Sequence, residues 1–165
     1  MKIIARDVPP RTAWSLEQAG VHPLLARLFA ARGVRSAEEL DDNASKLLPP
    51  QTLRGTQEAA VLLADAIAQG QRICIVADYD CDGATACATG LRGLRMLGAR
   101  PDQLSYVVPD RALHGYGLTP PIVELVKAQQ ADVLVTVDNG MASHEAVTRA
   151  RALGMRVIIT DHHLP

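Results

Sequence analysis

The sequence predicts an α/β fold: a parallel, Rossmann-like sheet with flanking helices, preceded by a small helical N-terminal cap. From residue 72 onward, short runs rich in β-branched residues alternate with helical stretches. These runs end at Asp78, Pro109, Asp138 and Asp161, so that successive ends lie 31, 29 and 23 residues apart. Each interval has the length of one strand and one helix, which is typical of repeated right-handed βαβ units in a parallel sheet.

The N-terminal third of the chain has a different pattern, in which proline pairs separate short helical stretches. Val21–Arg32 has apolar residues on one helical face, and a glycine follows it. Ser36 is the expected N-cap of a further short helix, with Glu39 at the capping-box position. We therefore expect a helical cap over residues 1–55 and a main domain over residues 56–165.

The main domain begins with a predicted amphipathic helix, Thr56–Ala68, for which Thr56 is the expected N-cap. The β-branched runs that follow are short and largely apolar, so we expect buried strands. The expected strands are 72–78, 104–109, 132–138 and 156–161. The expected helices between them are Gly83–Leu97, Thr119–Gln129 and Ser143–Leu153, the last two N-capped by Thr119 and Ser143.

The composition excludes several classes of protein. The chain has 17 lysines and arginines against 18 aspartates and glutamates, and a net charge of −1 excludes nucleic-acid binding through an overall positive field. A hydrophobic share of 48% and a charged share of 21% exclude wholesale disorder. The three cysteines have no C-x-x-C spacing, which excludes a zinc knuckle. No leader-like or membrane-spanning apolar segment is present, so we expect a cytoplasmic protein, and we take it to be a monomer.

The densest group of chemically active residues follows the first predicted strand. Asp78, Asp80 and Asp82 alternate in a segment that we expect to be extended, so their carboxylates face one way and Tyr79 packs on the other side. Carboxylates this close repel one another, and hard divalent cations are the usual remedy. Gly83 then allows a tight turn into a helix whose N-terminus favours a phosphate. The alternative is an acidic turn with solvated side chains.

Two further strand ends carry potential metal ligands. Asp138 precedes an Asn-Gly turn and could bridge two ions, although this pattern is also ordinary turn chemistry. Asp161 precedes His162 and His163, and an imidazole ligand suits manganese, cobalt or zinc better than magnesium. Consecutive side chains point apart, so we expect one histidine to be a direct ligand and the other to orient a ligand or to contact a substrate phosphate.

The loop after the second predicted strand offers a phosphate-binding residue, Arg111, between closely spaced glycines. The alternative is a mobile connection in which Arg111 only pairs with Asp110. His114 is either a substrate contact or a surface residue. The candidate substrate-binding residues of this loop are Arg111, His114, Gly115, Tyr116 and Gly117.

Four motifs in this order, D-Y-D-C-D-G, P-D-R with H-G-Y-G-L, V-T-V-D-N-G and T-D-H-H, resemble the DHH phosphoesterase superfamily. With the upstream R-G-V-R-S-A-E-E-L segment and the terminal T-D-H-H-L-P, the chain is similar to the RecJ family of bacterial exonucleases from about Leu24 to Pro165. The resemblance implies 5′-to-3′ hydrolysis of single-stranded DNA in recombination and repair, with manganese or magnesium. It also implies single-stranded DNA and other DNA repair or recombination proteins as partners.

The resemblance implies a two-ion centre in which Asp138 is the shared ligand. The implied metal ligands are Asp80, Asp82, Asp138 and His162, and with His163 they make up the catalytic set. Asp78 and Asp161 are implied supporting residues, and Arg111 with the H-G-Y-G loop would lie near the DNA backbone. The family's catalytic domain continues past the D-H-H motif, so we expect this chain to be an N-terminal piece of a longer protein, incomplete at its C-terminus and inactive by itself.

Two other functions remain open at this stage. A haloacid-dehalogenase-type phosphatase has the nucleophile motif D-x-D-G-T, but here Ala84 stands where the threonine belongs. Trapping of an aspartyl-phosphate would favour that enzyme class. The other alternative is a non-catalytic fragment that binds metal or nucleotide, which nuclease assays would distinguish.

Overall fold

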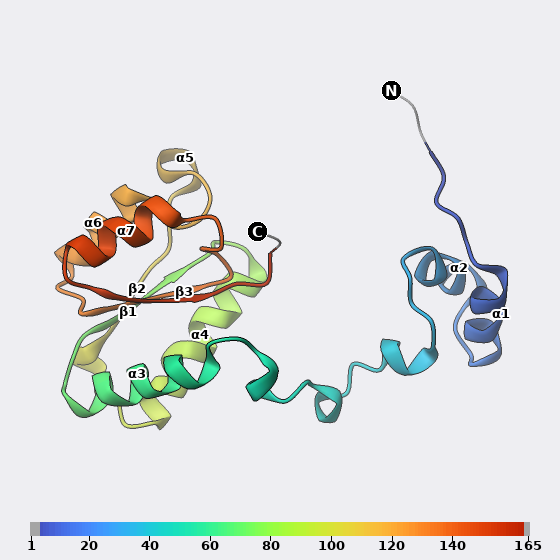
Figure 1. The fold of residues 1–165 in the computed structure, drawn as a ribbon, viewed down its shortest axis with the longest axis horizontal. Coiled ribbons are helices and arrows are strands. Elements are labelled where there is room, and N and C mark those ends of the chain that lie inside the picture. The colour runs from blue at the N-terminus through green and yellow to red at the C-terminus, as the bar shows by residue number, and fades with distance from the viewer. Residues whose placement is uncertain (1–3, 164–165) are drawn as a thin grey trace. The chain divides into compact units, whose positions relative to one another are not determined.

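The structure is a computed structural model in which residues 4–163 are described. The chain divides into two compact units, Met1–Leu53 and Arg54–Pro165 (Figure 1). The sequence pattern places this division two residues later, at residues 55 and 56. Among the described residues, no helix is long and apolar enough to cross a membrane.

The first unit is built on two short α-helices, α1 (Pro10–Gln18) and α2 (Pro23–Ala31). Each begins with a proline, whose fixed φ angle suits the first helical position. Its small core consists of Ala13, Leu16, Ala26 and Ala30. Three 3₁₀ turns follow: η1 (Ala37–Leu40), η2 (Ala44–Lys46) and η3 (Pro50–Thr52).

The predicted capping box at Ser36 is wrong. Ser36 stands at the N-cap position of η1, but its side chain makes no capping hydrogen bond. The Glu39 carboxylate accepts a hydrogen bond from the backbone N–H of Arg35, at 3.0 Å, one residue before the expected donor. A 3₁₀ turn is tighter than the α-helix for which the capping box is defined, so the reciprocal geometry is not reached.

The second unit is a four-stranded parallel sheet with order β2-β1-β3-β4, which confirms the predicted fold class. Its strands are β1 (Ile73–Ala77), β2 (Leu104–Val107), β3 (Val133–Val137) and β4 (Arg156–Thr160). Its helices are α3 (Thr56–Ala68), α4 (Cys81–Met96), α5 (Arg111–His114), α6 (Pro120–Ala128) and α7 (His144–Ala152), with the 3₁₀ turn η4 (Pro101–Gln103) before β2.

Helices cover both faces of this sheet, with α3 and α4 on one side and α6 and α7 on the other (Figure 1). The side chains of β1 alternate between the two layers: Cys74 and Val76 lie in the core beneath α6 and α7, whereas Ile73 and Ile75 lie in the core with α3 and α4. Every residue of β1 and β3 is buried. Burial on both faces of the sheet explains why these strands are continuous apolar runs in the sequence.

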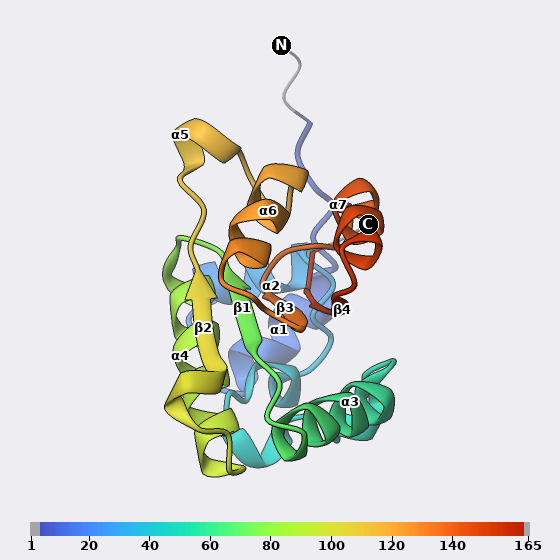
Figure 2. The same ribbon diagram turned by 90° about the vertical axis from the view of Figure 1, so that its left-hand side faces the viewer.

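The strand order creates a crevice between β1 and β3. The chain leaves β1 through α4 to reach β2 on one side, and then returns through α6 to β3 on the other side of β1 (Figure 2). Neighbouring strands whose connections leave in opposite directions form a switch point, where ligands of open α/β sheets bind. The residues just after β1 and β3 therefore flank the most favourable ligand position of the fold.

One N-cap and one helix start differ from the expected ones. α3 begins at Thr56, but the N-cap is Gly55, with a φ of 78°. α4 begins at Cys81, two residues before the predicted start, because Asp80 acts as its N-cap. Thr119 and Ser143 do occupy the N-cap positions of α6 and α7, although neither side chain makes a capping hydrogen bond.

Candidate metal centre

The three aspartates after β1 do not lie in one extended segment, so that part of the prediction is wrong. Asp78 is buried beyond the strand and accepts a hydrogen bond from the Tyr79 N–H at 2.8 Å. Asp80 caps α4 by accepting from the Gly83 N–H at 3.3 Å, and Asp82 lies in the first turn of this helix. The carboxylates converge through a helix cap rather than through strand alternation.

Gly83 allows the first turn of α4 to pack directly against the end of β1. A Cβ atom at this position would lie 2.7 Å from both the Cβ atom and the carbonyl oxygen of Asp78, which is too close for any other residue. The glycine thus serves close approach rather than a turn into the helix. Its N–H, at the helix N-terminus that the sequence pattern offers to a phosphate, donates to Asp80.

Simultaneous negative charge on the Asp80 and Asp82 carboxyl groups is unfavourable. The Gly83 N–H is the largest influence on the pKa of Asp80 and lowers it. A hydrogen bond with Asp82, desolvation, and the charges of Asp82 and Asp78 outweigh this and raise the pKa of Asp80 overall. The pKa of Asp82 is lowered by its own backbone N–H and by the hydrogen bond with Asp80. Such opposite shifts are typical of two carboxyls that compete for one proton, a conflict that a bound cation relieves.

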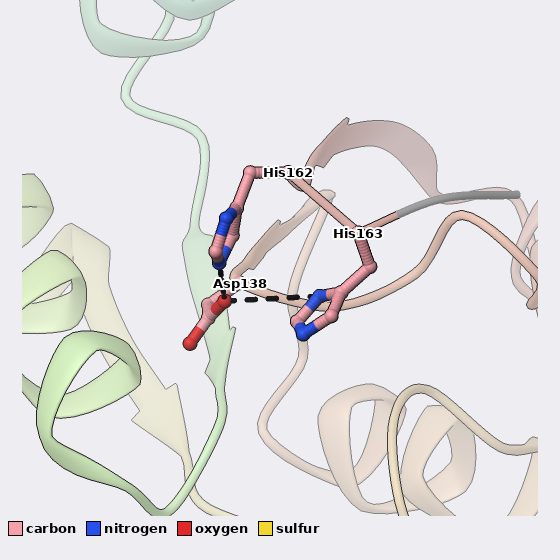
Figure 3. A group of neighbouring side chains, drawn as sticks. All are labelled: Asp138, His162 and His163. Carbon is pink, nitrogen blue, oxygen red and sulfur yellow. Dashed lines mark hydrogen bonds and ion pairs between the residues drawn. The ribbon is translucent and has the colours of Figure 1, made fainter. Parts of the chain in front are cut away.

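Asp138 lies at the carboxyl end of β3 in a left-handed conformation, with a φ of 65°, which is uncommon for any residue but glycine. Its N–H donates to the Thr160 carbonyl at 3.0 Å, which ties it to the end of β4. Its side chain is only 6% exposed, and its Oδ1 atom lies 2.8 Å from His162 Nε2 and 3.9 Å from His163 Nδ1 (Figure 3).

Asp161 orients His163. Its carboxylate accepts from the backbone N–H of Met141 at 2.9 Å and lies 2.7 Å from His163 Nδ1. Burial by itself raises the pKa of Asp161, but these hydrogen bonds and the His163 charge lower it overall. The same contact raises the pKa of His163. The network therefore assigns a proton to Nδ1, which leaves Nε2 of the neutral ring with a free lone pair.

The structure places three of the four predicted ligands, Asp80, Asp138 and His162, in two triads that share Asp138. The fourth, Asp82, belongs to neither triad, whereas Asp78, expected only as a supporting residue, belongs to one. Asp138, His162 and His163 form one triad, and the other consists of Asp78, Asp80 and Asp138; within each, the ligand atoms lie within 4.8 Å of one another. Asp82 is 3.7 Å from His162 Nε2. Within residues 4–163, the arginine salt bridges are Arg100–Asp102 and Arg149–Glu124, away from this cluster. Carboxylates combined with imidazoles fit a divalent ion such as Mn²⁺.

Tyr116 supports this cluster from the loop after α5. Its hydroxyl donates to the Asp138 carbonyl at 3.2 Å and lies 3.1 Å from His163 Nδ1, while its ring meets the His163 ring edge-on. Burial and the negative charges of the neighbouring aspartates raise the pKa of Tyr116 to about 12, so the hydroxyl keeps its proton. Gly115 and Gly117 on either side have positive φ angles, which lets the loop turn toward the sheet.

Arg111 lies over the ring of Tyr79, with its guanidinium carbon 4.8 Å from the ring centre. This cation–π contact orients the arginine and gives Tyr79 a role that the sequence pattern, which predicts simple packing, misses. Asp110 uses its carboxylate on the Ala112 N–H, at 2.8 Å, rather than on Arg111. His114 accepts from the Asp110 N–H at 3.2 Å, a contact within its own loop.

Family comparison agrees with this geometry. The family described as "DHH family, N-terminal domain" matches residues 72–165. The chain belongs to the DHH family. It is 50% identical over 147 residues to the single-stranded-DNA-specific exonuclease RecJ of Salmonella typhimurium, a match that covers 89% of this chain and 25% of the relative. The chain thus spans about a quarter of the length of the curated relatives it matches.

Solved structures of RecJ proteins are also similar to the chain. An exonuclease RecJ bound to manganese matches with 41% identity and a TM-score of 0.62, covering 72% of this chain and 29% of that one. RecJ of Thermus thermophilus in complex with Mn²⁺ matches with 36% identity and a TM-score of 0.62, covering 95% and 22%. Its complex with Mg²⁺ matches with 32% identity and a TM-score of 0.51, covering 94% and 18%. The predicted resemblance to the RecJ family is confirmed.

Proposed function

We propose that this chain supplies the metal centre of an exonuclease that hydrolyses phosphodiester bonds of single-stranded DNA in the 5′-to-3′ direction, in recombination and repair. The observation that carries this proposal is the convergence of two donor triads on Asp138, at the switch point between β1 and β3. The similar proteins are single-stranded-DNA-specific exonucleases, and their solved structures contain Mn²⁺ or Mg²⁺. We place this activity in a monomeric cytoplasmic protein that works with other repair proteins.

The residues proposed to hold two divalent ions are Asp80, Asp82, Asp138 and His162, with Asp138 shared. Membership of both triads is the property that a shared ligand needs. When bound, two ions supply Lewis acidity toward the phosphate and make water nucleophilic at neutral pH. Asp78 and Asp161 lie deeper and hold the surrounding backbone, since each accepts a main-chain N–H.

His163 is proposed to act on the substrate side of the centre. Asp161 holds its Nδ1 atom, while its side chain remains 47% exposed. The Nε2 atom can therefore contact a phosphate oxygen or carry a proton there. A pocket of about 320 Å³ lies next to it, with Tyr116, Gly117 and Gly140 among its lining residues. This pocket offers space beside the metal centre for part of a nucleotide.

Arg111 is proposed to bind a backbone phosphate, because its guanidinium is exposed and is oriented by Tyr79. The remaining proposed substrate-binding residues are His114, Gly115, Tyr116 and Gly117. For Tyr116 the contacts with Asp138 and His163 support a place directly beside the reacting phosphate.

A second function is favoured for the chain by itself. Because it spans about a quarter of the matched relatives, the isolated chain is proposed to bind metal without degrading DNA. The metal triads lie wholly within residues 78–163, whereas a DNA-binding channel needs more surface than one crevice.

A chimera tests the proposed activity. The chain would replace the 147 matching residues of the Salmonella typhimurium relative, and a 3′-labelled single strand would be incubated with Mn²⁺. We expect the chimera to shorten this strand, the isolated chain to leave it intact, and Asp138→Asn to lower the chimera's rate at least about 100-fold. Asp132→Asn, on the opposite edge of the sheet, is the matched control. Degradation by the Asp138→Asn chimera at the unsubstituted rate would contradict the proposal.

A further inference from the structure

Asn139, the residue after Asp138, is polar and yet only 1% exposed. A buried amide is costly unless its hydrogen-bonding groups are satisfied. The Nδ2 group of Asn139 donates to the Val137 carbonyl at 2.9 Å and to the Val76 carbonyl at 3.2 Å. Both of its hydrogens are therefore used on main-chain oxygens.

The two acceptors determine which way the amide faces. Carbonyl oxygens only accept hydrogen bonds, so the nitrogen and not the oxygen of Asn139 must point toward them. The Oδ1 atom is buried, with no hydrogen-bond partner within residues 4–163. The position thus requires two donors from one short side chain, which asparagine supplies and aspartate does not.

The two acceptors belong to the strands that carry the metal ligands. Val76 is in β1, which leads to Asp78 and Asp80, and Val137 is the last residue of β3, which leads to Asp138. Val137 pairs with Ala77, the last pair between these strands. Asn139 therefore joins the ends of β1 and β3 at the point where the sheet ladder stops.

The same side chain also restrains the backbone of Asp138. The hydrogen bond from Asn139 to Val137 spans Asp138, whose φ of 65° is unfavourable for an aspartate. Such a conformation persists only where surrounding contacts hold it. Relaxation to an ordinary extended φ would turn the Asp138 carboxylate away from Asp78 and Asp80.

We infer that Asn139 is a positioning residue that fixes the distance and direction of Asp138 relative to Asp78 and Asp80, and thereby sets the affinity of the centre for divalent metal. This inference deepens the proposed function, because it rests on a metal centre that includes Asp138. It gives the Asn-Gly pair a role beyond that of a turn.

The test compares Asn139→Ala with a matched control, Gln103→Ala. Gln103 is also a buried amide, and its Nε2 donates to the carbonyls of Gln71 at 3.1 Å and Ile67 at 3.4 Å, at the amino-terminal end of β2. Mn²⁺ binding would be followed through the loss of the electron paramagnetic resonance signal of the free ion. We expect both variants to unfold at lower urea concentration, but only Asn139→Ala to lose affinity, by about tenfold or more.

A second measurement on the metal-free chain does not depend on Mn²⁺ binding. Backbone chemical shifts of Asp138 should report the left-handed conformation in the wild type and in Gln103→Ala, and lose it in Asn139→Ala. In the wild type, the side-chain amide protons of Asn139 should exchange with solvent far more slowly than those of the exposed Asn43. This exchange measurement decides the case if Asn139→Ala does not fold.

Two outcomes overturn the inference: Mn²⁺ affinity in Asn139→Ala equal to that in Gln103→Ala, or rapid exchange of the Asn139 amide protons in the wild type. Absence of Mn²⁺ binding by the wild-type chain has a different meaning. It would refute the proposed metal centre and the effect on affinity, whereas the Asp138 shifts would still show whether Asn139 controls that conformation.

Discussion

The two ends of the parallel strands in the sheet differ in how their charged side chains are paired. The amino edge is the end at which the strands begin, near Asp132, and the carboxyl edge is the end after the strands, near Asp138. At the amino edge, the Asp132 carboxylate accepts the Arg72 N–H at 2.9 Å, and Asp102 forms a salt bridge with Arg100 at 3.2 Å. The Arg156 side chain bonds Gln71. Each of these charged side chains has a neutral or oppositely charged partner.

At the carboxyl edge, aspartates gather around one another. Asp78, Asp80 and Asp138 lie within one ligand sphere, and the basic groups that contact Asp138 are the two imidazoles. A left-handed residue and a buried amide do not distinguish the edges, because Asp138 and Asn139 at the carboxyl edge have counterparts in Gln130, with a φ of 60°, and the buried Gln103 at the amino edge. Like charges gathered at one site indicate function, because their mutual repulsion does not contribute to stability. The difference between the edges supports the proposal that side chains of the protein itself satisfy the charges at one end of the sheet, whereas bound cations would do so at the other.

Among the substitutions that test the difference between the two edges, Asp138→Asn should have the largest effect. Asparagine tolerates a left-handed φ at least as well as aspartate, so the fold should persist while the shared charge is lost. We expect the Mn²⁺ affinity measured by isothermal titration calorimetry to fall at least about 100-fold. Asp132→Asn should leave that affinity unchanged. A loss of affinity in Asp132→Asn equal to that in Asp138→Asn would show that the two edges do not differ.

Alanine substitutions at two glycines of α4 distinguish the effect of close packing at the carboxyl edge from the effect of helix propensity on stability. A Cβ atom on Gly83 would overlap Asp78, whereas one on Gly93 has no neighbour within 4 Å. Gly83→Ala should lower the free energy of unfolding by about 1–3 kcal/mol through overpacking. Gly93→Ala should raise it by up to about 1 kcal/mol. Urea denaturation of the metal-free chain measures both, and equal effects would exclude a special approach at Gly83.

Tyr116→Phe tests the support that the loop gives to the centre. The change removes the hydroxyl that contacts the Asp138 carbonyl and His163, and leaves the ring in place. We expect the Mn²⁺ affinity to fall about tenfold. Tyr106→Phe, at an exposed position of β2, is the control. An unchanged affinity in Tyr116→Phe would mean that the hydroxyl does not influence the metal ligands.

The smallest expected effect is the pH dependence of the Asp161–His163 pair in the metal-free chain. The pKa of His163 is raised from 6.5, so the stabilisation from its charge is fully present below pH 6.5 and is lost as the pH rises through the raised value. The pKa of Asp161 is lowered from 3.8, so its contribution is lost only as the pH falls through that lower value.

Melting temperatures with a chelator present measure this dependence. The melting temperature of Asp161→Asn should lie further below that of the wild type near pH 5 than near pH 9. Asp102→Asn is the matched control at the amino edge, because its partner Arg100 stays charged over this range. A deficit of Asp161→Asn that is the same at both pH values would contradict the assigned pairing.

Much of the carboxyl edge could be predicted from the sequence. Asp78, Asp138 and Asp161 each follow an apolar, β-branched run, and a parallel sheet brings the ends of such runs to one edge. The spacing of these runs identifies the parallel sheet, and therefore also the side of the molecule on which the ligands meet. Knowledge of which strands are neighbours was not needed for this step.

The prediction fails where two local signals compete. Strand alternation predicts an extended segment through Asp82, but Asp80 is a favoured N-cap residue and α4 begins right after it, at Cys81. The same preference for a local cap explains why Gly83 is the third residue of the helix rather than its first. The cap signal was present in the sequence and indicates the observed start of the helix.

The roles of Asn139 and Tyr116 could not be predicted from local sequence. Asn139 bonds Val76, 63 residues earlier, only because β1 and β3 are neighbours in the sheet. Tyr116 reaches His163 across 47 residues through a loop whose direction depends on two positive φ angles. Such contacts depend on strand order and loop path, which the apolar pattern does not encode.

The most direct test of the central claim is a crystal structure of the chain with Mn²⁺, in which anomalous scattering locates the ions. We predict two peaks, about 3.5–4 Å apart, with the Asp138 carboxylate between them and His162 beside one of them. The amino edge near Asp132 and Asp102 should show none. Peaks at the amino edge, or no peak within ligand distance of Asp138 at saturating Mn²⁺, would contradict the claim that bound cations complete the carboxyl edge.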